Sequence, residues 1–133
     1  MVRDAGRVPT WLLTTEDHPA GRLAPYQAAG VEILAVPPGP GGGLDPAAAL
    51  ARLGDRGLTR LLVEGGGRLA AALLRAGLVD RLAWFRAARV IGGDGRPAVG
   101  PLDPASLAAA PAFRRETVLA VGDDLLETYA RAH

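Results

Sequence analysis

One stretch of the sequence decides the fold: Leu61-Leu62-Val63-Glu64-Gly65-Gly66-Gly67-Arg68-Leu69-Ala70-Ala71-Ala72-Leu73-Leu74. Three apolar residues, the middle of an expected buried strand, lead into an acid and three glycines, and an alanine- and leucine-rich helix follows. Such a junction places free backbone N–H groups and the positive end of a helix dipole at the carboxyl edge of a sheet. Anionic cofactors bind at this edge in open α/β sheets. The stretch therefore predicts an anion site, with Glu64 on the same edge.

The composition indicates one ordinary globular domain. The chain has 133 residues, of which 49% are hydrophobic and 22% charged, and its formal net charge is +1. This balance gives no reason to expect nucleic acid or an acidic membrane surface as a partner. No apolar run approaches the roughly 20 residues of a membrane-spanning helix. We therefore expect a cytoplasmic protein with no nucleic-acid or membrane partner.

The residue types that are missing exclude several kinds of catalysis. The chain has no Cys and no Lys, so a thiolate nucleophile, a disulfide, a Schiff base and a phosphate-loop lysine are excluded within it. A serine triad would need Ser106 with His18 or His133, which lie far apart in the sequence. A zinc site is not expected either. The sequence identifies no catalytic residue, and chemistry carried by a cofactor remains.

The periodicity of the chain predicts an α/β fold. Buried strands are expected at residues 8–15, 31–36, 59–63 and 81–87, and a closing hairpin at 113–121 and 125–130. Helices are expected at 23–29, at 68–76, at 106–110, and in a segment that Asp45 caps and Pro46 begins. Pro25 is acceptable only in the first turn of its helix. These elements imply one domain over 1–133, a mainly parallel sheet flanked by helices and ending in an antiparallel hairpin.

Two interpretations of the glycines at 65–67 stay open. In the functional one, the backbone approaches a pyrophosphate and Arg68 adds positive charge. In the structural one, the glycines form a tight turn that needs positive φ angles. Glu64 is either an acid at a strand end that faces solvent, or an acceptor of hydrogen bonds from N–H or O–H groups of a substrate.

Other polar and glycine-rich segments also leave alternatives. Residues 37–43 are interpreted as a flexible surface connection, because they lack the Lys and the Ser or Thr of a phosphate loop. Residues 92–95 form either a plain turn or a cofactor contact. Arg86 and Arg89 are either solvated or help to bind a phosphate.

Four sequence blocks follow one another in an order that resembles a known family. They are Leu62-Val63-Glu64-Gly65-Gly66, Leu69-Ala70-Ala71-Ala72-Leu73-Leu74, Ala76-Gly77-Leu78-Val79-Asp80 and Ile91-Gly92-Gly93-Asp94-Gly95. Their succession resembles the C-terminal reductase domain of the bifunctional riboflavin-biosynthesis deaminase/reductase. The flanks are similar too, from Val8-Pro9-Thr10-Trp11 to the hairpin at Gly122-Asp123-Asp124.

The resemblance implies a dihydrofolate-reductase-like fold, NADPH as cofactor and a homodimer. The implied reaction is reduction of the ribose of 5-amino-6-(5-phosphoribosylamino)uracil to its ribityl form. The acid that matches Glu64 would contact substrate. The segment implied to lie along NADPH comprises Gly66, Gly67, Arg68, Leu69, Ala70, Ala71 and Ala72.

The resemblance covers only part of the family's reductase domain. In the family, that domain begins with further strands and loops that carry cofactor and substrate contacts, and no such segment precedes Val8 here. We therefore expect a partial reductase domain that lacks the first strands, carries part of the site and has little or no activity alone. Two alternatives stay open. One is an inactive fragment or dimerising module that needs a partner chain, and the other is a related oxidoreductase with another substrate.

Overall fold

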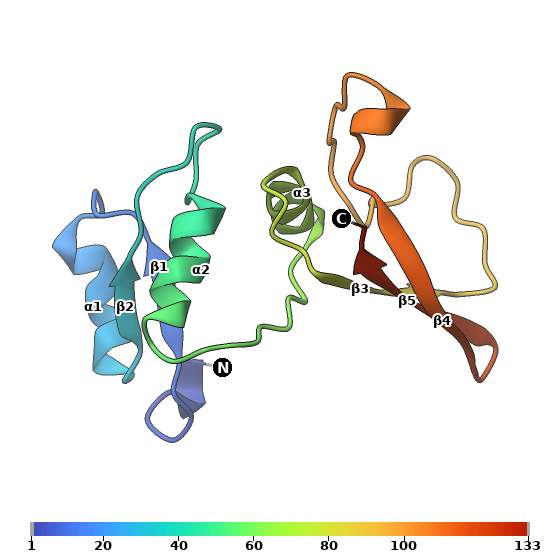
Figure 1. Cartoon of the computed structure of the whole chain (residues 1–133). Helices are drawn as coiled ribbons and strands as arrows, with labels where there is room; N and C mark the ends of the chain where they lie inside the picture. The colour runs from blue at the N-terminus through green and yellow to red at the C-terminus, as the bar shows by residue number, and fades with distance from the viewer. Residues whose placement is uncertain (1, 133) are drawn as a thin grey trace. The chain divides into compact units, whose positions relative to one another are not determined.

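The structure, a computed structural model that describes residues 2–132, has the mixed α/β architecture that the sequence predicts (Figure 1). The chain divides into two compact units, Met1–Leu61 and Leu62–His133. The first contains η1 (Val2–Asp4), β1 (Trp11–Thr14), α1 (Ala20–Ala28), β2 (Glu32–Ala35) and α2 (Pro46–Gly54). The second contains α3 (Gly67–Arg75), β3 (Arg81–Arg86), η2 (Leu107–Ala109), β4 (Phe113–Val121) and β5 (Asp124–Arg131).

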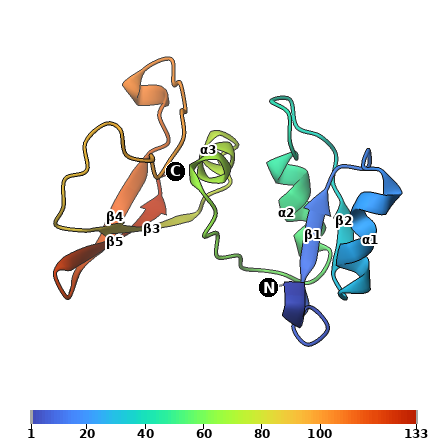
Figure 2. The same ribbon diagram turned by 180° about the vertical axis from the view of Figure 1, so that it is seen from behind.

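The first unit is built on two parallel strands. β1 pairs with β2 so that Leu13 lies opposite Leu34, and Figures 1 and 2 both show the strands between α1 and α2. The best-buried large side chains are on or beside β2, where Leu34 is 2% and Val36 1% exposed. The strand–helix–strand order predicted for residues 8–36 is therefore confirmed, with strands shorter than predicted.

Helix α2 begins as its sequence predicts. The Asp45 carboxylate accepts hydrogen bonds from the backbone N–H groups of Ala47 at 2.8 Å and Ala48 at 3.0 Å. Pro46 occupies the first helical position, where its missing N–H costs nothing because that group would have no partner in the helix. The predicted cap is confirmed.

The prediction for Pro25 is wrong, because α1 starts earlier than expected. The helix begins at Ala20, so Pro25 lies inside it rather than in its first turn. A proline there cannot donate to the carbonyl oxygen of Gly21, one turn earlier. Both Gly21 and Pro25 are exposed, so water can reach that carbonyl, and the helix tolerates the missing bond.

The glycine-rich segment 37–43 forms a surface turn. The backbone N–H of Gly39 donates to the carbonyl oxygen of Gly43 at 2.9 Å, and that of Asp45 donates to Pro37 at 3.0 Å. Gly42 and Gly43 have φ angles of 74° and 84°, which favour glycine. A turn therefore accounts for these glycines, and this segment needs no phosphate-binding role.

The second unit is built on an antiparallel sheet in the order β3-β5-β4. β4 and β5 form the predicted hairpin, in which Val121 pairs with Asp124 across a tight turn. Gly122 has a φ of 61°, as such hairpin turns require. β3, predicted over 81–87, pairs with the other side of β5. The hairpin and the fourth strand are confirmed.

The strand predicted at residues 59–63 is not formed. These residues have no regular secondary structure, and Leu62 is 80% exposed. A strand is stable only when neighbouring strands satisfy its backbone hydrogen bonds, and no described strand pairs with this segment. The chain is α/β as predicted, but within residues 2–132 the parallel sheet contains only β1 and β2, and the antiparallel sheet has three strands.

Candidate functional site at the start of helix α3

The N-terminus of α3 has backbone donors that no side chain caps. Gly66 is the cap residue, with φ −71° and ψ 174°, and it has no side chain to accept a hydrogen bond. Its carbonyl oxygen accepts from the N–H groups of Leu69 at 3.0 Å and Ala70 at 3.2 Å. The N–H groups of Gly67 and Arg68 precede these bonds and have no acceptor inside the helix. They point toward the space in front of the helix, where the dipole favours an anion.

Glycine occupies positions 65, 66 and 67, before and at the start of α3, in three different local environments. None of them has a positive φ, so the interpretation that they form a turn requiring such angles is wrong. A side chain at Gly65 would meet Leu69 Cδ2 at 2.5 Å, and one at Gly67 would meet the carbonyl oxygen of Pro97 at 2.8 Å. A side chain at Gly66 would meet nothing within 4 Å. Packing therefore explains Gly67, where the obstacle is backbone. At Gly65 the nearest atom is the end of the flexible Leu69 side chain, which can move aside, and Gly66 borders open space.

The structure brings most of the predicted site residues to one end of α3. Glu64 is exposed and precedes the helix in a segment without regular structure. Gly66, Arg68 and Leu69 are exposed, and Gly67, Ala70 and Ala72 are half-buried. Ala71 is 2% exposed, so its side chain packs inside the second unit. The assignment of these residues to substrate and cofactor stays a prediction.

One segment beside this site was not predicted from the sequence. The backbone N–H of Gly100 donates to the carbonyl oxygen of Gly67 at 2.9 Å, and residues 97–100 lie against the first residue of α3. The sequence gives no signal for this contact, because a pair of distant glycines that approach each other has no local pattern. Pro97 at its start and Pro101 directly after it indicate only that the segment is not helical.

The arginines and the second glycine cluster are partly explained by local structure. Arg86 pairs with Glu127 of the adjacent strand, with 3.7 Å between Nε and Oε2, so its charge is already partnered. Gly92 has a φ of 89°, which a plain turn explains. Arg89 is exposed and makes no ion pair with any residue between 2 and 132.

The serine considered for a triad has a local structural role. The Ser106 hydroxyl accepts a hydrogen bond from the backbone N–H of Ala109 at 3.3 Å, so it caps η2. His18 lies in the first unit and Ser106 in the second, and His133 lies outside the described residues. Between residues 2 and 132, no three His, Cys, Asp or Glu side chains lie close enough to hold a metal ion. Nor does any helix in that range have the length and apolarity to cross a membrane.

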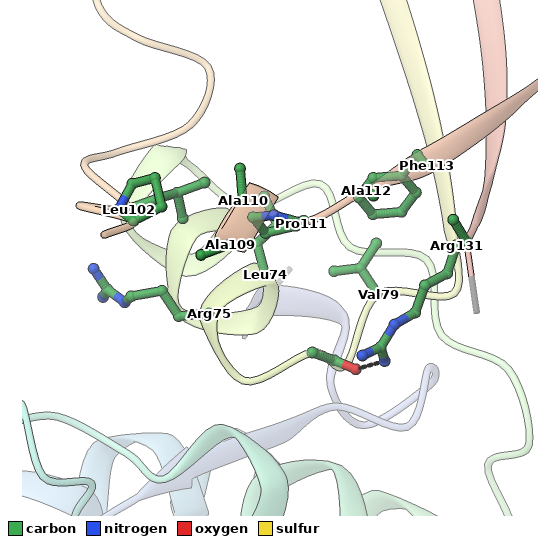
Figure 3. A pocket seen from close by; sticks show the side chains of 13 residues that line it. Leu74, Arg75, Val79, Leu102, Ala109, Ala110, Pro111, Ala112, Phe113 and Arg131 are labelled. Atoms are coloured by element: carbon green, nitrogen blue, oxygen red, sulfur yellow. Dashed lines mark hydrogen bonds between the residues drawn. The ribbon is translucent and has the colours of Figure 1, made fainter. Parts of the chain in front are cut away.

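A cavity of about 440 Å³ lies at the other end of α3 (Figure 3). Its lining includes the side chains of Leu74, Val79 and Phe113 together with Arg75 and Arg131, and more of its surface is polar than apolar. The Arg131 guanidinium donates to the carbonyl oxygen of Gly77, and Arg75 donates to that of Pro101 at 2.8 Å. Cations near a helix C-terminus are stabilised by its dipole. The two arginines therefore hold the chain around the end of α3.

The fold and the site define an α/β protein with a glycine-rich, uncapped helix N-terminus. Comparison with known proteins places it more narrowly, because the model of the RibD C-terminal domain family matches residues 2–126. The chain belongs to this family. It is 37% identical to the riboflavin biosynthesis protein RibD of Escherichia coli over 84 aligned residues. The aligned stretch covers 63% of this chain and 23% of that protein.

Solved structures support the fold. RibD of Acinetobacter baumannii matches with a TM-score of 0.70 and 18% identity, over 92% of this chain and 37% of that one. A pyrimidine reductase-like protein of Corynebacterium diphtheriae matches with a TM-score of 0.72 and 21% identity, over 92% of this chain and 49% of that one. The chain thus spans less than half the length of each relative. At these identities the structures establish the shared fold.

Proposed function

We propose that this chain provides the reductase function of riboflavin biosynthesis, with NADPH as hydride donor. The substrate would be 5-amino-6-(5-phosphoribosylamino)uracil, whose ribose is reduced to the ribityl form. Membership in the RibD C-terminal domain family supports the pathway. The observation that carries the proposal is the open space at Gly66, next to helix amides that no side chain caps.

The residues at the start of α3 fit the pyrophosphate of such a cofactor. An anion at this point can accept from the N–H groups of Gly67 and Arg68, which have no acceptor inside the helix. A side chain at position 66 would fill the space that the phosphate needs, and Gly66 leaves that space open. The exposed Arg68 adds a positive charge beside it. The segment from Gly66 to Ala72 then carries the cofactor contacts, with Ala71 contributing through packing.

In the proposed mechanism, this chain only binds and orients the cofactor and the substrate. When bound, NADPH would supply a hydride to the anomeric carbon of the ribose, the bond from that carbon to the ring oxygen would break, and water would supply the proton that this oxygen takes up. Glu64 precedes the glycines, and we propose that its carboxylate accepts a hydrogen bond from an N–H or O–H group of the substrate. The first-turn amides hold the pyrophosphate. No nucleophilic side chain is required, which agrees with a chain that has no Cys and no Lys.

NADPH binding by the purified chain is the direct test. We expect saturable binding and a melting temperature that rises with NADPH concentration. A melting temperature that does not change in millimolar NADPH would contradict the proposed cofactor site. Turnover with the aminouracil ribotide, followed by loss of the reduced nicotinamide absorbance, tests the substrate separately. A related pyrimidine nucleotide serves as the comparison substrate, and faster turnover of that compound would favour an oxidoreductase with another specificity.

The Glu64→Gln substitution is expected to weaken substrate binding without affecting stability. A hydrogen bond to a charged group contributes about 1.5–3 kcal/mol, so we expect the Kd for substrate to rise roughly tenfold to a hundredfold. Because Glu64 is exposed, the melting temperature should stay at the wild-type value. Glu16→Gln, a change of an exposed acid in the first unit, is the matched control. An unchanged Kd for Glu64→Gln would remove Glu64 from the site.

A second candidate function is that of a dimerising module, because one face of the antiparallel sheet is apolar and exposed. Phe85 and Leu119 both lie opposite Leu126 in the strand register and therefore share a face. Their exposed fractions are 65% and 53%, and exposed apolar patches of this kind mark interaction sites. We expect a homodimer in sedimentation experiments and dissociation by Phe85→Glu. A monomeric wild type at high protein concentration would contradict this proposal.

A further inference from the structure

The contact between Gly67 and residues 97–100 is unusually close. The carbonyl oxygen of Pro97 lies 2.8 Å, and the backbone nitrogen of Gly100 3.1 Å, from the point that a Cβ atom of residue 67 would occupy. Real Cβ atoms essentially never approach backbone within 3.0 Å, and backbone atoms cannot swing aside as a flexible side chain can. The segment can therefore lie where it does only because residue 67 has no side chain.

The other side of the contact is a glycine as well. A Cβ atom on Gly100 would lie 3.2 Å from the carbonyl oxygen of Gly67 and 3.6 Å from the Cβ atom of Ala71. Neither Gly67 nor Gly100 has a positive φ, so the conformation of each would admit other residues. Close approach alone explains the glycine at both positions. Ala71, the best-buried residue of α3, completes the contact with a small side chain.

This contact fixes the connection between β3 and η2 to the helix. The hydrogen bond from Gly100 to Gly67, at 2.9 Å, is the backbone bond that joins this connection to the first residue of α3. The uncapped N–H groups at the start of the helix belong to Gly67 itself and to its neighbour Arg68. A shift of residues 97–100 would therefore be felt directly at the donors of the proposed site.

We propose that residues 97–100 act as a buttress that sets the position of the first turn of α3, and that Gly100 is a positioning residue that acts on the bound ligand through Gly67. The proposal rests on the proposed function for the identity of the ligand, NADPH. The buttress acts through sterics and one backbone hydrogen bond, and it contributes no charge to the ligand. Its effect is on the placement of the N–H donors, because a hydrogen bond weakens when its donor moves out of line with the acceptor.

Three alanine substitutions in the complete chain test the buttress. Gly67→Ala meets backbone at 2.8 Å, Gly100→Ala meets it at 3.2 Å, and Gly41→Ala, in the surface turn 37–43, meets nothing within 4 Å. Gly41 has no positive φ and lies outside the proposed site, so its substitution is the matched control. We expect the Kd for NADPH to rise roughly tenfold or more for Gly67→Ala, to rise less for Gly100→Ala, and to stay at the wild-type value for Gly41→Ala.

Hydrogen exchange of the apo protein tests the same contact without any ligand. The Gly100 amide is expected to exchange faster in Gly67→Ala than in wild type, because its acceptor is displaced, and the Leu69 and Ala70 amides should follow. A protein that binds no NADPH in its wild-type form would refute the proposed function, and the exchange data would still decide the buttress. Wild-type exchange and wild-type Kd in Gly67→Ala would overturn the buttress. If Gly67→Ala does not fold, Gly100→Ala provides both measurements.

Discussion

The Gly66→Asp substitution is expected to abolish most NADPH binding while leaving the protein as stable as before, or slightly more stable. Position 66 is the cap residue of α3, and aspartate is among the best N-cap residues. Its carboxylate would accept the first-turn N–H groups itself and add a negative charge where the pyrophosphate belongs. Two unit charges about 4 Å apart repel by roughly 1 kcal/mol in water and 4 kcal/mol near a protein surface. We therefore expect the Kd to rise at least tenfold.

Two further variants at position 66 distinguish charge repulsion of the pyrophosphate from competition for the backbone N–H groups. Gly66→Asn also caps the helix but carries no charge, and Gly66→Ala only fills part of the open space. The expected order of Kd values is Asp above Asn above Ala, and the difference between Asp and Asn should shrink at high salt, where charges are screened. The melting temperature of Gly66→Asp should be at or above that of wild type. Equal NADPH affinity in all variants would mean that the phosphate does not bind here.

The prediction of helix α3 from sequence succeeded because its signals are local. An apolar period and a stop glycine act within a few residues, and the Asp45 cap before Pro46 is an equally local signal for α2. The strand at 59–63 failed because its apolar residues reveal only that burial is favourable. A strand also needs neighbouring strands to pair with, and these come from distant parts of the sequence.

The candidate site also has features that local sequence predicts and features that depend on non-local contacts. Glu64 and the glycines at 65–67 could be selected because they follow one another in the sequence. The reasons for these glycines could not be assigned, since only coordinates distinguish Gly66, which borders open space, from Gly67, which touches Pro97. The Gly100 contact is non-local and involves backbone atoms, which no side-chain pattern encodes. Pro25 gives a similar lesson, because an exposed helix can tolerate a residue that local rules place only at its start.

Leu34→Ala is expected to have the largest effect on stability. Leu34 is 2% exposed and lies opposite Leu13 in the parallel pair. Replacing a buried leucine with alanine costs about 2–5 kcal/mol, depending on how far the cavity collapses. That is a large share of the 5–15 kcal/mol that typically stabilises a whole protein. We expect a marked loss of the melting temperature and of the free energy of unfolding in denaturant. Leu107→Ala, at a side chain 92% exposed, should change stability by less than about 0.5 kcal/mol.

The part of the structure that Leu34→Ala destabilises is as informative as the size of the stability loss. Leu34 belongs to the first unit, and every predicted cofactor contact belongs to the second. If the two units unfold separately, Leu34→Ala should remove hydrogen-exchange protection from β1 and β2 and leave that of α3 intact. If protection is lost in both at once, the units form one cooperative structure in solution. NADPH would then stabilise the Leu34→Ala variant as a whole, because a ligand that binds only the folded state stabilises every part that folds with its site.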